Sequence, residues 1–170
     1  MQLSRIIAVL FVVVQQIIFI DIAYNWNESW VTKSNEAEAM ETGTGKNWLM
    51  AVLVTCGIFF AVAFTGIGLL FAYFRGCATN ETFISLTLIF ILVVTGIQLS
   101  GEEASLLTSA ILSAYATYLA YIAVGSNPNG TCNPTLGESN ALGIVLGIGL
   151  TLVSLAWTGY SWTASNMLSE

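Results

Sequence analysis

The sequence has little charge, no histidine and few basic residues. Charged residues make up 8% of the 170 positions, whereas an ordinary soluble domain carries about 25%, so the charges cannot coat a soluble particle. The absence of histidine excludes a Ser-His-Asp triad, a Cys-His pair and a histidine metal site. Four lysines and arginines form no basic patch, which excludes a nucleic-acid partner. These absences exclude a soluble enzyme or nucleic-acid-binding protein.

Long apolar runs occupy most of the chain instead. A membrane-spanning helix needs about 20 predominantly apolar residues, and in lipid the backbone must satisfy its own hydrogen bonds. We therefore expect an all-α, polytopic membrane helical bundle with about five transmembrane helices. It would be an integral membrane protein with a single domain over residues 1–170. The expected helices lie near residues 6–24, 48–74, 82–100, 104–124 and 141–162.

The first apolar run also has the look of a signal peptide, but the small-residue pattern of a cleavage site is poor there. Residues 25–47 carry four of the ten acidic side chains and are expected to form a polar loop. With five spans, Arg5 and Arg75 fall on one side of the membrane, whereas Lys33 and Lys46 fall on the other. The basic residues therefore do not decide the orientation.

A few polar side chains stand inside the apolar runs. Asp21 is either a site for a cation, a proton or a lipid headgroup, or a helix-end carboxylate at the interface. Gln15 either faces a groove or forms hydrogen bonds between helices. Together with Thr95, Gln98 and Ser113, these residues are candidates for a groove that lowers the cost of moving a lipid headgroup. The tryptophans lie near the ends of apolar runs, where aromatic belts form, and have no expected ligand role.

Two of the three cysteines lie in connections between helices. Two spans separate Cys77 from Cys132, so both fall on the same side of the membrane. The alternatives are a disulfide on an oxidising side and two free thiols on a reducing one. Of three glycosylation sequons, only that of Asn129 lies in a connection of useful length. No cysteine spacing indicates a metal site, and no cofactor is expected.

Three segments have a recognisable pattern in the same order along the chain. They are DIAYNWNESWV at 21–31, CATNETFIS at 77–85, and YATYL at 115–119 followed by SNPNGTCNP at 126–134. These segments resemble the serine incorporator family. The resemblance implies a fold of about ten membrane helices, of which this chain resembles the middle five. It also implies two helical subdomains joined by a long crossing helix that includes residues 6–24.

The resemblance further places the Cys132 loop outside the cytosol and residues 25–47 inside it. It implies a protein that handles lipids, through phospholipid scrambling or the supply of serine to lipids, with membrane lipids as partners. The alternative is a structural or accessory subunit, with other membrane chains supplying the missing helices. No enzymatic activity is expected, because Asp21 is the only carboxylate placed in an apolar run.

Overall fold

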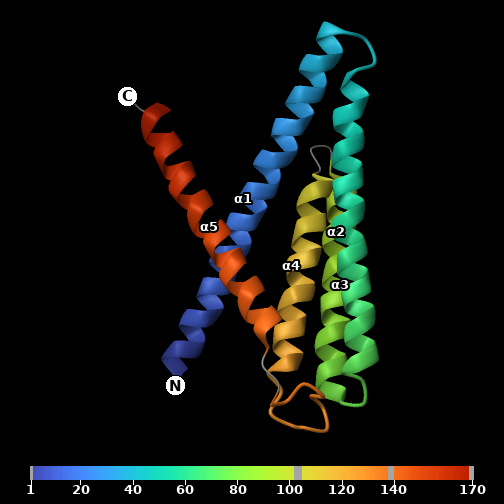
Figure 1. Cartoon of the computed structure of the whole chain (residues 1–170), viewed down its shortest axis with the longest axis vertical. Coiled ribbons are helices and arrows are strands. Elements are labelled where there is room, and N and C mark those ends of the chain that lie inside the picture. The colour runs from blue at the N-terminus through green and yellow to red at the C-terminus, as the bar shows by residue number, and fades with distance from the viewer. Residues whose placement is uncertain (1, 102–104, 138–139, 169–170) are drawn as a thin grey trace. The chain divides into compact units, whose positions relative to one another are not determined.

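Five α-helices make up the computed structural model, which describes residues 2–101, 105–137 and 140–168. The helices are α1 (Gln2–Met40), α2 (Gly45–Tyr73), α3 (Ala78–Ser100), α4 (Leu106–Gly125) and α5 (Ala141–Leu168) (Figure 1). No strand occurs in these ranges, and all five helices are long and apolar enough to cross a membrane. The expected all-α, multi-pass membrane protein is confirmed. The expected start of the fourth helix, Ala104, lies outside the described residues.

The contacts within the chain form two compact units, where the sequence was interpreted as one domain. Unit 1 consists of Met1–Ile22 and Ser139–Glu170, which are the first half of α1 and all of α5. Unit 2 consists of Ala23–Glu138, which hold the rest of α1 and helices α2 to α4. Helix α1 therefore contributes residues to both units.

The polar loop expected over residues 25–47 is wrong for most of its length, because α1 continues to Met40. No glycine or proline occurs in residues 25–40. Trp26, Trp30 and Ser34 recur every four residues and so share one face of the helix. The two indoles pack against a buried cluster that includes Val52, and Ser34 is itself buried. The exposed acidic face of an amphipathic helix had been mistaken for a loop.

The turn between α1 and α2 is held by side chains of α1. Gly43 has a φ of 98°, a conformation that suits glycine. The Glu38 carboxylate accepts hydrogen bonds from the backbone N–H groups of Gly43 and Gly45, at 3.0 and 3.1 Å. The Ser34 hydroxyl donates to the Gly45 carbonyl at 2.9 Å. The bond to the Gly45 N–H satisfies a donor at the start of α2 that has no partner within the helix.

Helix α4 is the most buried helix of the chain. Of its most apolar window, 61% is buried, compared with 11–22% for the other four helices. It is rich in alanine, serine and threonine, and small residues allow helix backbones to approach closely. The hydroxyls of Ser109, Ser113 and Thr117 donate to carbonyls one turn earlier in α4. Each of these three buried hydroxyl groups therefore has an acceptor for its proton.

Helices α2 and α4 approach each other closely at Gly66. A Cβ atom added there would lie 2.6 Å from Cγ2 of Thr117, which is closer than atoms can stand. The Thr117 hydroxyl also reaches the Ala63 carbonyl of α2, at 3.4 Å. Toward the C-terminal end of α2, a buried cluster joins α2, α3 and α4. Its members are Ile67, Leu70, Phe74, Ile84, Ile91, Ala120 and Val124.

Replacing Gly66 with alanine is expected to destabilise unit 2. The added methyl group must push α4 away or force Thr117 off its rotamer, and overpacking of this kind costs about 1–3 kcal/mol. Gly68 is the matched control, because nothing lies within 4 Å of its added Cβ. Thermal unfolding in detergent should show a lower midpoint for Gly66→Ala and an unchanged or higher one for Gly68→Ala. Equal midpoints would contradict the close approach.

Candidate functional site

Within unit 1, α5 crosses the first half of α1 (Figure 1). A groove lined by both apolar and polar side chains of the two helices lies in this unit. The indole Nε1–H of Trp157 donates a hydrogen bond to the Asp21 carboxylate at 2.7 Å. The groove is open and has a volume of about 470 Å³. Its lining residues are Ile17, Ile18, Asp21, Trp157, Thr158, Ser161 and Trp162.

Helical spacing brings these side chains together. On α5, Trp157 and Ser161 are four residues apart and share a face, as do Thr158 and Trp162. The start of α5 is held by Asn140, whose side-chain oxygen accepts from the Gly143 N–H at 3.0 Å. Phe19 on α1 and Ser154 on α5 are buried.

The groove combines one carboxylate, two indole rings and two hydroxyls. A carboxylate attracts a cation, and the face of an indole ring binds ammonium groups through cation–π attraction. The Thr158 hydroxyl donates to the Ser154 carbonyl at 2.8 Å, which leaves its oxygen able to accept. The arrangement suits the polar end of an amphiphile whose tail lies along the apolar helix surface. Among the described residues, no group of three His, Cys, Asp or Glu side chains is placed to hold a metal ion.

Asp21 is the only one of the five groove candidates from the sequence that lines this groove. Gln15 belongs to the same unit but is buried, with 6% of its surface exposed. The other three, Thr95, Gln98 and Ser113, belong to unit 2. Ser113 is 1% exposed and donates to the Ser109 carbonyl, so it lies inside the α2–α4 packing.

The sequence analysis missed the partners of Asp21 on α5. Trp157 and Trp162 were interpreted as residues of an aromatic belt, and Thr158 and Ser161 were not singled out. A usable signal was present, because these four residues repeat at a spacing of four on one helix. This spacing does not reveal the pairing with Asp21, which lies 136 residues before Trp157 in the chain.

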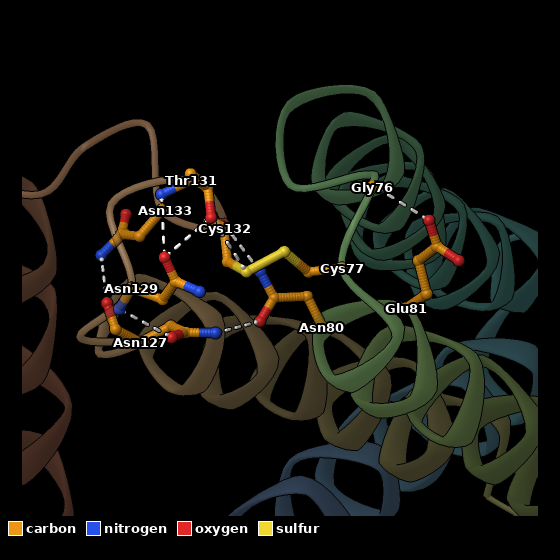
Figure 2. Close-up of a disulfide and its surroundings, with 9 residues drawn as sticks. All are labelled: Gly76, Cys77, Asn80, Glu81, Asn127, Asn129, Thr131, Cys132 and Asn133. Carbon is orange, nitrogen blue, oxygen red and sulfur yellow. Dashed lines mark hydrogen bonds between the residues drawn. A yellow bond between two sulfur atoms is a disulfide. The ribbon is translucent and has the colours of Figure 1, made fainter.

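At one end of unit 2, a disulfide joins Cys77 to Cys132 with their Cα atoms 5.6 Å apart (Figure 2). The Asn80 side chain supports this link in two ways. Its Nδ2 donates to the Cys132 carbonyl at 2.8 Å, and its Oδ1 accepts from Nδ2 of Asn127 at 2.9 Å. The bond and the amides tie the α2–α3 connection to the loop that follows α4.

The buried Asn133 side chain stabilises the same loop through hydrogen bonds. It is 2% exposed, and its Nδ2 donates to the carbonyls of Gly125 and Asn127 at 2.7 and 3.1 Å. Its Oδ1 accepts from both the N–H and the hydroxyl of Thr135. Two of the segments that resemble serine incorporators, 77–85 and 126–134, therefore meet here. A disulfide and hydrogen bonds join them.

A family model described as Serine incorporator (Serinc) matches residues 1–170. The chain belongs to the serine incorporator family. Family membership agrees with the five apolar helices, which make the protein a multi-pass integral membrane protein.

Three relatives illustrate the similarity of this serine incorporator chain to curated proteins. Serine incorporator 3 of Bos taurus is 33% identical over 76% of this chain and 28% of its own length. A probable serine incorporator of Dictyostelium discoideum is 33% identical over 95% of this chain and 40% of its own length. Serine incorporator 2 of Mus musculus is 27% identical over 80% and 31%, respectively. The chain thus spans well under half the length of the relatives it matches.

Loss of the disulfide is expected to destabilise this serine incorporator chain. The bond closes a loop of 55 residues, for which the chain-entropy model gives about 4 kcal/mol, less where the membrane keeps the helices formed. Cys77→Ser should lower the unfolding midpoint in detergent and remove its dependence on reductant. Cys56→Ala is the control, because Cys56 is a free, buried cysteine. A wild-type midpoint that does not respond to reductant would show that the bond contributes nothing.

Proposed function

We propose that this chain moves phospholipids through its membrane, and that the groove at Asp21 receives their headgroups. The observation that carries the proposal is the bonded pair of Asp21 and Trp157, which places a carboxylate in an open groove between two helices long and apolar enough to cross a membrane. A charge at the centre of a membrane helix costs about 3 kcal/mol on insertion scales, and charges within membrane segments often mark pathways. The relatives carry the name serine incorporator, so lipids that contain serine are among the proposed substrates.

The position of Asp21 along α1 suits the entry of a headgroup. At 1.5 Å per residue, the apolar part of α1 from Leu3 to Ile20 is about 27 Å long. The hydrocarbon core of a bilayer is about 30 Å thick. Asp21 therefore lies close to the edge of the hydrocarbon, where a headgroup would begin its passage. A carboxylate there replaces part of the hydration that the headgroup loses.

Polar side chains continue along α1 beyond Asp21. Within unit 2, the exposed residues Asn25, Glu28, Thr32 and Glu36 recur every three or four residues and share one face of the helix. A second shallow groove follows this face, and its lining residues are Asn25, Glu28, Ser29, Thr32, Lys33 and Glu36. This polar face offers a headgroup contacts between the aqueous phase and the membrane part of the helix.

The proposed role makes and breaks no covalent bond, so the chain would act on lipids without being an enzyme. A lipid headgroup needs polar contacts while its tails stay in the bilayer. The exposed apolar side chains of α1 and α5, such as Ile17 and Leu155, provide the surface for the tails. Membrane lipids are therefore the proposed partners.

Transfer of a fluorescent phospholipid in vesicles tests the proposal. The purified chain should speed the loss of fluorescence when a membrane-impermeant reductant is added to vesicles that contain an acyl-labelled phosphatidylethanolamine. Asp21→Asn keeps the shape and an accepting oxygen but removes the charge. It should slow transfer roughly tenfold, the equivalent of about 1.4 kcal/mol in the barrier.

Glu41→Gln is the matched control, since it removes an exposed carboxylate that directly follows α1 and lies outside both grooves. It should transfer lipid like the wild type. A thermal scan of each variant separates lost transfer from lost folding. If Asp21→Asn transfers lipid at the wild-type rate with unchanged stability, the charge has no role in transfer. A folded wild-type chain without transfer would contradict the proposed function.

A further inference from the structure

A shallow groove of about 400 Å³ lies on an exposed face of α3, in the half of the helix that follows the disulfide. Its lining residues are Ala78, Glu81, Thr82, Ser85, Leu86 and Ile89. We propose that this groove binds one molecule of phosphatidylethanolamine, a phospholipid with a primary ammonium headgroup, in the leaflet on the disulfide side. The proposal concerns a lipid bound to unit 2 and does not depend on lipid transfer.

The groove changes from polar to apolar along the helix, as a phospholipid does from headgroup to tail. Glu81, Thr82 and Ser85 lie near the start of α3, whereas Leu86 and Ile89 follow toward its middle. Leu86 and Ile89 are 57% and 55% exposed, so they offer apolar surface to an acyl chain. From Glu81 to Ile89 the helix rises about 12 Å, and one leaflet contributes about 15 Å of hydrocarbon. The length of the groove therefore suits a lipid of one leaflet.

The disulfide identifies the membrane side of the groove. Cys77 directly precedes α3 and is bonded to Cys132. Disulfides form and persist on oxidising sides of membranes and are rare in the cytosol. The polar part of the groove lies at this end of α3, so the bound headgroup faces the oxidising side.

The Glu81 carboxylate is held in place, yet one of its oxygens remains available. Its Oε1 accepts a hydrogen bond from the backbone N–H of Gly76 at 2.9 Å. Figure 2 shows the Glu81 side chain directed toward the Gly76 turn and away from the disulfide. Among the described residues, Oε2 of Glu81 has no hydrogen-bond partner. This oxygen can therefore accept a strong hydrogen bond from a cationic group.

Two hydroxyl groups complete a set of acceptors that matches a primary ammonium group. The Thr82 hydroxyl donates to the Ala78 carbonyl at 2.7 Å, which leaves its oxygen able to accept. Ser85 is partly buried and lines the same groove. A primary ammonium group has three N–H donors, and the carboxylate and the two hydroxyls offer an acceptor for each. None of the described lining residues is aromatic, so the cation–π contacts that favour a quaternary ammonium are missing.

Arg75 supplies the opposite charge that a zwitterionic headgroup requires. It directly precedes Gly76, whose N–H bonds to Glu81, and its side chain is exposed. No ion pair joins Arg75 to Glu81 within the part of the chain that the structure describes. A guanidinium group pairs well with a phosphate, so Arg75 is the expected partner of the lipid phosphate. Phosphatidylserine carries an additional carboxylate that Glu81 would repel, and it should bind less tightly.

Native mass spectrometry of the full chain in mild detergent tests the site, with phosphatidylethanolamine and phosphatidylcholine of the same acyl chains as probes. The wild type should bind one phosphatidylethanolamine roughly tenfold more tightly than phosphatidylcholine, the ratio expected for a hydrogen bond to a charged group. Glu81→Gln keeps an oxygen for the Gly76 N–H and should lower the affinity for phosphatidylethanolamine to that for phosphatidylcholine. Arg75→Gln should weaken binding of both lipids alike, because both carry the phosphate.

The control variant is again Glu41→Gln, because Glu41 is exposed and does not line this groove. It should bind both lipids like the wild type. A thermal scan of each variant shows whether its fold is retained. Glycerophosphoethanolamine, the soluble headgroup without tails, should not displace the lipid at equal concentration, since it lacks the contacts to Leu86 and Ile89.

Cross-linking locates the lipid in the wild type, so it decides the question even where a variant does not fold. Phosphatidylethanolamine with a photoreactive acyl chain should label Leu86, Ile89 and their neighbours on α3. Unlabelled phosphatidylethanolamine should suppress this labelling more strongly than phosphatidylcholine does. Equal affinity of the wild type for the two lipids, unchanged selectivity in a folded Glu81→Gln, displacement by the soluble headgroup, or labelling spread evenly over the five helices would each overturn the proposal.

Discussion

Helix α4 lies against both α2 and α3 because its side chains are small enough for the backbones to approach one another. Lipid tails are as apolar as the side chains they surround, so burial of apolar surface does little to drive helices together in a membrane. Close van der Waals packing must do this instead. The contact between Gly66 and Thr117 shows how tight the fit is. The hydroxyls of Ser109, Ser113 and Thr117 can be buried there because each donates to a carbonyl of its own helix.

Hydrogen bonds of polar side chains stabilise both ends of the α2–α4 packing. Such bonds suit a position outside the hydrocarbon. At one end the disulfide and the amides of Asn80 and Asn133 join the two connections. At the other, Glu38 and Ser34 of α1 hold the start of α2. Water competes for hydrogen bonds at these ends, so several bonds, and in one case a covalent link, hold each connection.

In unit 1, a carboxylate lies among exposed apolar side chains. Its exposed apolar side chains face the bilayer, yet α1 carries a carboxylate that an indole on α5 meets at hydrogen-bond distance. Burial of an unpaired charge in lipid is costly, whereas a bonded carboxylate in an open groove keeps contact with polar groups. This placement separates Asp21 from Gln15, which the sequence alone presented as a similar candidate. Both lie on one helix, but only Asp21 faces the groove.

The helices themselves were readable from the sequence because each must be apolar over about 20 residues to cross a bilayer. The pattern predicted five helices and the side shared by Cys77 and Cys132. It failed at residues 25–40, where the helix is amphipathic and its buried face is carried by two tryptophans and Ser34. Polarity by itself does not distinguish such a helix from a loop.

Tertiary structure alone decided which polar residues from distant segments meet. Asp21 meets Trp157 across 136 residues, and Asn80 meets Cys132 across 52. Ser113 resembles a groove residue in the sequence but bonds to its own helix. Hydropathy and spacing are properties of one segment, so the sequence by itself determined the helices and their membrane location. A hydrogen bond between distant segments depends on which helix faces meet, and packing of the whole chain decides that.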